Sequence, residues 1–157
     1  MVMISSLISQ LKKDYPQFIY RESDVSSWEP NSKAILYNNN AEPAQVLHEL
    51  GHALLGHATF GHDITLLSIE RAAWAYAKRE LADTYHVSIP EEIIENSLDT
   101  YRDWIHKRSL CPYCNVSGIQ QSKTAYRCTT CDRAWKVNDA RSCQLRRTVI
   151  HTNKYPS

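Results

Sequence analysis

His48, Glu49 and His52 are the residues whose types and spacing most clearly predict chemistry. They belong to the run His48-Glu49-Leu50-Gly51-His52, an HExxH pattern. Four residues along an α-helix advance the chain by about 6 Å and about 400°, so the two imidazoles point the same way and can share one tetrahedral metal ion. Glu49 would lie beside a zinc-bound water, whose pKa the ion lowers to about 7, and would accept its proton as it attacks a carbonyl. The pattern predicts a zinc hydrolase, for which a peptide bond is the usual target.

The residues around this pattern predict that its helix is partly buried. They form an apolar helical stripe of Ala44, Val46, Leu47, Leu50, Ala53, Leu54 and Leu55. A carboxylate and two imidazoles are costly to bury without partners, and a bound cation removes that cost. A chance match on an ordinary packing helix is therefore the weaker interpretation.

A catalytic zinc needs a third protein ligand and one position left open for water. The downstream candidates are His57, His62, Glu70 and Glu80. His57 would lie about 140° around an uninterrupted helix from His52 and face away, unless the helix breaks at Gly56. Glu70 is preferred, because the seventeen intervening residues after His52 allow an antiparallel helix to return to the site. His62 remains the alternative, since three histidines also make a good zinc site, and Glu80 is better explained as a surface residue.

Four cysteines predict a second metal site. They form two CxxC pairs, Cys111 with Cys114 and Cys128 with Cys131, separated by thirteen residues. This is the spacing of two knuckles that close one tetrahedral site, a zinc ribbon. Two disulfides are disfavoured in a chain without a secretion signal, and four thiolates accept iron as well as zinc. We expect two zinc ions per chain, one catalytic and one structural.

Charge divides the chain near residue 101. Residues 1–101 hold seven Lys/Arg against fourteen Asp/Glu, and residues 102–157 hold eleven against three. This break predicts a catalytic domain over residues 1–107, the ribbon over 108–140 and a basic C-terminal tail over 141–157. The ribbon is either a structural clip or a binding module for nucleic acid or an acidic partner. Its candidate binding residues are Lys123, Arg127, Arg133, Trp135 and Lys136.

The remaining patterns predict an α+β fold. Apolar spacing and turn residues predict helices over residues 4–11, from Pro43, over 67–85 and after Pro90, and strands over 18–20 and 34–37. The second of these strands would align an extended substrate if its edge is open. The chain shows no membrane-spanning run and no signal peptide, so we expect a cytoplasmic protein.

The sequence resembles the ImmA/IrrE family of metallopeptidases over about residues 7–85. The likeness lies in the HExxH run with its flanks, residues 48–57, and in the segment Glu70-Arg71-Ala72-Ala73-Trp74-Ala75-Tyr76-Ala77. The resemblance implies a minimal gluzincin, a zincin-like core in which the HExxH helix packs on a second helix beside a small sheet. It implies His48, His52 and Glu70 as zinc ligands. It also implies a protein substrate, a helix-turn-helix transcriptional repressor of a phage or mobile element.

The cysteine module departs from that family and leaves two alternatives open. The chain is also similar to SprT-like proteases, which act on DNA-associated proteins, although their third ligand is a histidine. The other alternative is a non-catalytic protein that binds nucleic acid or a partner through its ribbon. Tyr37, His62 and Tyr76 are unranked candidates for stabilising an oxyanion.

Overall fold

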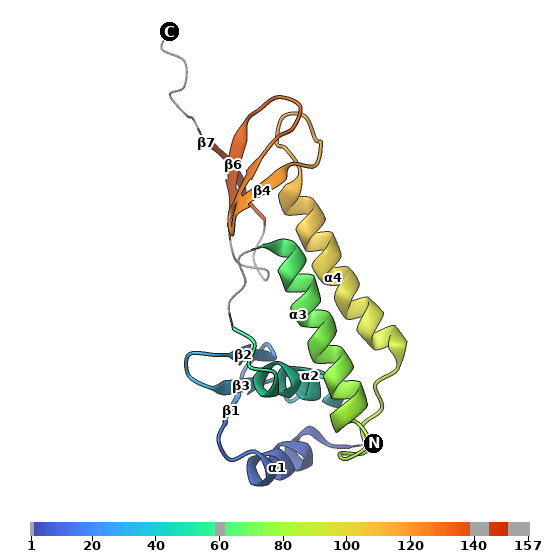
Figure 1. The fold of residues 1–157 in the computed structure, drawn as a ribbon. Helices are drawn as coiled ribbons and strands as arrows, with labels where there is room; N and C mark the ends of the chain where they lie inside the picture. Colours follow the sequence, from blue (N-terminus) through green and yellow to red (C-terminus); the bar gives the residue numbers. More distant parts are fainter. Residues whose placement is uncertain (1, 59–61, 139–144, 151–157) are drawn as a thin grey trace. The chain divides into compact units, whose positions relative to one another are not determined.

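The computed structural model describes residues 2–58, 62–138 and 145–150 (Figure 1). The fold is α+β, with four α-helices and two small sheets in the described residues. The chain forms two compact units, residues 1–59 with 68–96 and residues 60–67 with 97–157. The second unit thus contains 60–67 and 97–107 as well as the predicted ribbon.

The first unit begins with α1 (Ile4–Asp14), as the apolar spacing predicts. Leu7 and Leu11 of this helix are fully buried, and Lys12 and Lys13 lie in its last turn, where positive charge favours the helix dipole. The hydroxyl of Tyr20 donates hydrogen bonds to the carbonyls of Leu11 and Tyr15, at 3.2 and 3.1 Å. These bonds fix the end of α1 to the following strand.

Three short strands form the sheet of the first unit, in the order β1-β3-β2. The central strand β3 (Ala34–Tyr37) runs parallel to β1 (Ile19–Glu22) and antiparallel to β2 (Ser27–Glu29). The two strands predicted from the sequence are β1 and β3, whereas β2 was not predicted. Because β3 has a neighbour on both sides, it has no open edge for a substrate, and the edges belong to β1 and β2.

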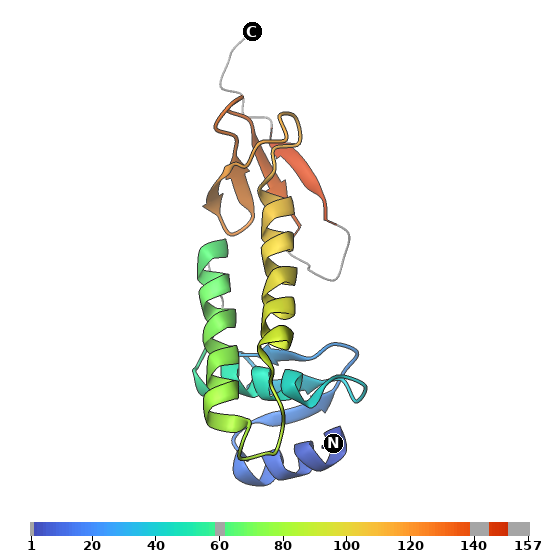
Figure 2. The same cartoon turned by 90° about the vertical axis from the view of Figure 1, so that its right-hand side faces the viewer.

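Helix α2 (Pro43–Leu54) carries the HExxH run and packs on this sheet. It begins at the predicted proline, which suits the first turn of a helix because it lacks an N–H group. In Figures 1 and 2, α2 (cyan) lies alongside β2 and β3. Figure 2 gives the same arrangement after a 90° turn. Leu47 and Leu50 of α2 and Ile35 of β3 are fully buried and form part of the core.

Helix α3 (Asp63–Tyr76) continues into a π-helical segment, η1 (Ala77–Leu81). The helix predicted over 67–85 therefore starts four residues earlier and changes its winding after Tyr76. Helix α4 (Glu91–Ser109) follows Pro90, as predicted, with two acidic residues in its first turn and three basic residues in its last.

The second unit contains an antiparallel sheet in the order β4-β5-β6-β7. Its strands are β4 (Ile119–Ser122), β5 (Ala125–Arg127), β6 (Ala134–Val137) and β7 (Arg147–Ile150). The prediction of a tail from residue 141 is wrong for residues 147–150, since β7 pairs with β6 along its whole length. Residues 139–144 and 151–157 lie outside the described residues.

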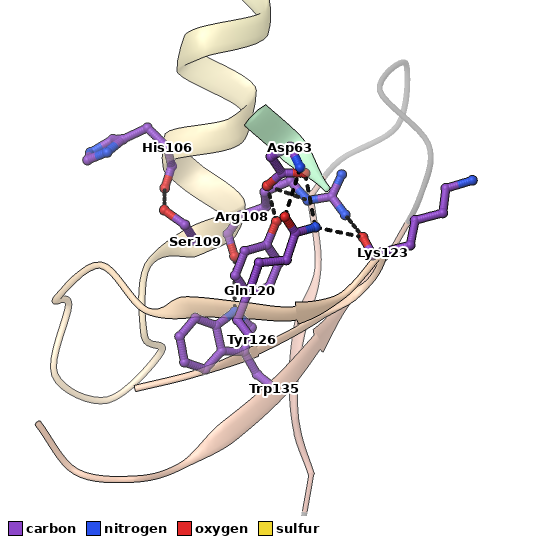
Figure 3. A network of polar contacts seen from close by, with 8 residues as sticks. All are labelled: Asp63, His106, Arg108, Ser109, Gln120, Lys123, Tyr126 and Trp135. Atoms are coloured by element: carbon purple, nitrogen blue, oxygen red, sulfur yellow. Dashed lines mark hydrogen bonds and ion pairs between the residues drawn. The ribbon is translucent and has the colours of Figure 1, made fainter. Parts of the chain in front are cut away.

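A buried polar network joins the start of α3 to this sheet (Figure 3). Gln120 accepts a hydrogen bond from the backbone N–H of Asp63 at 2.8 Å and donates one to its carboxylate at 3.2 Å. Tyr126 donates to the same carboxylate, and the guanidinium of Arg108 lies 4.0 Å from it. Arg108 is fully buried, stacks on Trp104 and donates to the carbonyl of Lys123 at 2.6 Å. The network fixes where α3 begins.

Candidate functional site

Helix α2 places His48 and His52 on one buried face. Their side chains are 1% and 7% exposed, and their ring centroids lie 4.6 Å apart. This is the result of the four-residue spacing on a regular helix, as the sequence predicts. Both rings therefore stand in the interior of the first unit, where polar nitrogens need partners.

Glu70 of α3 meets both imidazoles on the same side. One of its carboxylate oxygens lies 2.9 Å from Nε2 of His48, and the other lies 3.2 Å from Nε2 of His52. His48 Nε2 and Glu70 Oε2 have no hydrogen-bond partner, although they are buried and close together. The contact between these two atoms therefore lacks the geometry of a hydrogen bond. Two imidazole nitrogens and one carboxylate are a donor set that suits a divalent metal ion. The structure thus brings Glu70 to the predicted position.

A glycine allows this convergence. A Cβ atom added at Gly51 would lie 2.7 Å from the backbone oxygen of Ala73, closer than real Cβ atoms approach. Helices α2 and α3 therefore approach so closely at Gly51 that no side chain larger than the hydrogen of glycine fits there. Ala73 is fully buried and lies one turn after Glu70, so this close approach brings the carboxylate to the two histidines.

Three further side chains surround His48. The ring of Trp74 stacks on it, with centroids 4.2 Å apart and planes 6° from parallel. On the side away from Glu70, Nδ1 lies 3.1 Å from the amide nitrogen of Gln45 and 3.4 Å from the carboxylate of Glu49. Gln45 also donates to Glu49 at 2.9 Å. These contacts fix the plane of the imidazole and the position of the predicted base.

Two carboxylates border the histidines, and they play different parts. Glu49 has an oxygen within 4.8 Å of a ring nitrogen of each histidine, but its nearest approach is to Nδ1 of His48. Glu70 instead faces Nε2 of both rings. The donor atoms that converge on Glu70 are thus Nε2 of His48 and Nε2 of His52. Glu49 lies beside them, against Nδ1 of His48.

The charges of the site stabilise one another. Burial would lower the pKa of His48, but its contacts with Glu49 and Glu70 outweigh burial and raise the pKa to about 9. Burial would raise the pKa of Glu70, but the two histidines outweigh it and hold the pKa of that carboxyl well below its usual range. The site therefore pairs a negative carboxylate with a protonated imidazole, and a metal ion that binds at Nε2 of His48 would have to displace that proton.

His57 lies against His52, contrary to the expectation for an uninterrupted helix. Helix α2 ends at Leu54, and Gly56 adopts a left-handed conformation with φ 68°. The N–H of His57 then donates to the carbonyl of His52 at 3.0 Å, and Nδ1 atoms of the two rings lie 2.9 Å apart. Burial, followed by the proximity of His52, lowers the pKa of His57. His57 thus contacts Nδ1 of His52, whereas Nε2 of His52 faces Glu70.

The other candidates from the sequence lie elsewhere. His62 is exposed and immediately precedes α3, and Glu80 is exposed and pairs with Arg79 at 2.9 Å. Tyr37 ends β3 and Tyr76 ends α3, and both are half-buried.

The four ribbon cysteines form a second cluster, in the second unit. One sulfur from each lies within 4.8 Å of the others, and Cys111 and Cys131 are 3.7 Å apart. A tetrahedral set of four thiolates is the donor set of a structural zinc or iron site. The structure therefore has two groups of side chains that can hold a metal ion, as the sequence predicts.

The two CxxC segments have matching backbone geometry. The N–H of Cys114 points to the sulfur of Cys111 at 3.4 Å, and the N–H of Cys131 points to that of Cys128 at 3.4 Å. The residues after each pair, Asn115 and Asp132, have φ 58° and 61°. Asn and Asp tolerate this left-handed region best after glycine. The backbone N–H of Arg133 is the largest influence that lowers the pKa of Cys131, to about 6, which favours a thiolate.

One residue predicted to lie on the binding surface of the ribbon, Trp135, does not lie there. Trp135 is fully buried, stacks on Tyr126 and donates its indole N–H to the carbonyl of Arg108 at 3.0 Å, so its ring cannot stack on a base. Arg127 pairs with Asp132 at 2.9 Å. Arg133 and Lys136 are exposed, and Lys123 is half-buried. Arg133 lies over the exposed ring of Tyr113, 4.0 Å from its centroid.

The comparisons with known proteins add no relative: the chain matches no protein-family model, no curated protein and no solved structure. Among the described residues, no helix combines the length and apolar character needed to cross a membrane.

Proposed function

We propose that this protein is a zinc-dependent metalloendopeptidase with a gluzincin-type ligand set. One observation carries the proposal: His48 Nε2, His52 Nε2 and the carboxylate of Glu70 converge in a buried site, with a second carboxylate beside them. Three protein ligands leave the fourth position of zinc open, as catalytic sites require. The packing of the HExxH helix on a second helix and on a small sheet supports a zincin-like core in this proposal.

In this proposal each residue has a separate task. Bound zinc supplies Lewis acidity toward the scissile carbonyl and the attacking water. Glu49 accepts the proton of that water and later gives it to the leaving amine. Gln45 holds the Glu49 carboxylate by its 2.9 Å hydrogen bond, and Trp74 holds the ring of His48 by stacking. The chain therefore provides a base whose position is set before substrate binds.

Strand β2 is the edge at which we place the substrate backbone. It lies against α2, and its Trp28 donates the indole N–H to the carbonyl of His57 at 2.8 Å, next to the metal ligand His52. An extended peptide that pairs with a strand edge gains backbone hydrogen bonds without regard to its sequence. This assignment replaces β3, whose two edges are both occupied.

The resemblance to ImmA/IrrE metallopeptidases supplies the substrate class, a helix-turn-helix repressor. The contacts of Glu70 with both imidazoles favour this family over SprT-like proteases, whose third ligand is a histidine. The second zinc, in the ribbon, is structural and allows a small sheet with few buried residues to fold. We therefore propose two zinc ions per chain.

The decisive test is Glu49→Gln, with Glu42→Gln as its matched control. Both substitutions remove one carboxylate from α2 or its start, but Glu42 is exposed and makes no side-chain capping bond. Each variant is expressed together with a candidate helix-turn-helix repressor. Intact repressor and its fragments are measured by mass spectrometry, and bound zinc by elemental analysis.

We expect Glu49→Gln to retain two zinc ions per chain and to leave the repressor intact, because the base is lost and the ligands are not. Glu42→Gln should cleave like the parent protein. Cleavage by Glu49→Gln at the parental rate would refute the role of Glu49. Absence of zinc from a variant that lacks the four ribbon cysteines but keeps His48, His52 and Glu70 would refute the metal site.

A further inference from the structure

His52 has a contact on the side facing away from the convergent donor atoms. Its Nε2 faces Glu70 at 3.2 Å, and its Nδ1 lies 2.9 Å from Nδ1 of His57. The two rings meet edge to face, with planes 65° apart. Each nitrogen of His52 thus has one neighbour of its own, a carboxylate on the inner side and an imidazole on the outer side.

Three contacts hold His57 in this place. The left-handed Gly56 turns the chain back, and the N–H of His57 bonds to the carbonyl of His52. Its own carbonyl accepts the indole N–H of Trp28 at 2.8 Å. Trp28 in turn packs edge to face against Phe18, with ring centroids 5.4 Å apart. Contacts from both sides of the residue therefore aim its side chain at His52.

We propose that His57 is a positioning residue for the metal site, which accepts a hydrogen bond from Nδ1–H of His52. An imidazole that binds a metal through Nε2 must carry its proton on Nδ1. His57 Nδ1 must then present its lone pair, which places the His57 proton on Nε2. The pair fixes both the tautomer and the ring orientation of His52. This inference deepens the proposed function and rests on its metal site.

A structural explanation makes a different prediction. The backbone bonds that end α2 involve the N–H and C=O of His57, which any residue other than proline provides. If His57 only ended the helix, its imidazole would not matter to the metal. If it orients His52, the acceptor atom at the position of Nδ1 is what matters, and only a side chain with an acceptor there can replace it.

The experiment compares His57→Leu, His57→Asn and His57→Gln in the full-length protein. The amide oxygen of Asn branches from the same carbon as Nδ1 of histidine, whereas the Gln amide starts one carbon farther out. Zinc affinity is measured by competition with a chromogenic chelator, and the ribbon zinc serves as an internal reference. Cobalt-substituted protein provides the absorption of the His/Glu site, and denaturation of the metal-free protein provides stability.

We expect His57→Leu and His57→Gln to bind zinc at the His48/His52/Glu70 site about 10–100-fold more weakly, and His57→Asn to stay within about threefold of the parent protein. The cobalt absorption of the Leu variant should change and that of the Asn variant should not, with the stability of the metal-free proteins alike. Equal zinc affinity in the Leu and Asn variants, whether both high or both low, would overturn the proposal.

This outcome is separable from failure of the proposed function. Zinc affinity and cobalt absorption do not depend on cleavage, so His57 can position His52 even if Glu49→Gln retains activity. Conversely, a Leu variant with parental zinc affinity would overturn the role of His57 and leave the peptidase proposal standing.

Discussion

Gly51→Ala tests the contact between α2 and α3 that brings Glu70 to the histidines. The new Cβ would lie 2.7 Å from the backbone oxygen of Ala73, whereas ordinary contact begins at 3.4 Å, so the two helices must separate by about 0.7 Å at this point. The obstacle is backbone, which cannot rotate away as a flexible side chain can. Because Glu70 lies one turn from Ala73, its carboxylate is expected to move away from His48 and His52.

The expected cost follows from two opposing effects. Overpacking a core position costs about 1–3 kcal/mol. Replacing glycine by alanine inside a helix recovers about 1 kcal/mol. The metal-free protein should therefore lose about 1 kcal/mol of unfolding free energy. The loss of zinc affinity should be the larger effect, because metal sites tolerate ligand displacements of only about 0.2 Å.

The assay is urea denaturation of the metal-free protein together with zinc competition. Ser68→Ala is the control, because this exposed position on α3 changes helix propensity by at most about 0.5 kcal/mol without touching α2. The control should bind zinc like the parent protein. A Gly51→Ala protein that is stabilised by about 1 kcal/mol and binds zinc normally would show that the helices do not meet at this glycine.

Two other predictions concern stability and the ribbon. Tyr85→Phe removes a 2.6 Å hydrogen bond from the buried Tyr85 hydroxyl to the carboxylate of Asp14, and should lower the unfolding free energy by about 1.5–3 kcal/mol in urea denaturation. An unchanged midpoint would contradict that contact. Cys128→Ser should reduce bound zinc from two ions to one, measured by elemental analysis, and abolish the thiolate-to-cobalt charge-transfer absorption. Retention of that absorption would contradict the four-cysteine cluster.

Local patterns predict most of the first unit. Pro43 marks the start of α2 and Pro90 precedes α4, while the predicted strand 18–20 overlaps β1 (Ile19–Glu22) and the predicted strand 34–37 coincides with β3. These features depend on residues a few positions apart, which a sequence displays directly. The four-residue spacing of the HExxH histidines belongs to the same class, so their shared face follows from helix geometry alone.

The missed features depend on residues distant in sequence. The start of α3 at Asp63 is set by Gln120 and Tyr126, more than fifty residues away, so helical periodicity alone placed it too late. β2 has only three residues and exists because β3 pairs with it. The position of His57 has a local cause, because Gly56 ends the regular winding that would have turned His57 away from His52.

The burial of Trp135 could have been predicted from strand alternation. In β6, Trp135 and Val137 are buried and Lys136 between them is exposed. Successive side chains of a strand point to opposite faces, so a basic residue between two apolar ones indicates that the apolar pair faces inward. The same alternation turns the Trp135 ring away from any nucleic acid on the outer face.

The network around Asp63 determines where this protein can be shortened. Asp63 and Glu70 lie on one helix, yet the partners that cap its first turn, Gln120 and Tyr126, are encoded beyond residue 97. A truncated protein that ends near residue 101, where the charge changes sign, would expose the Asp63 carboxylate to water and let α3 fray at its first turn, two turns before Glu70. The first unit and the ribbon are thus best expressed as one polypeptide.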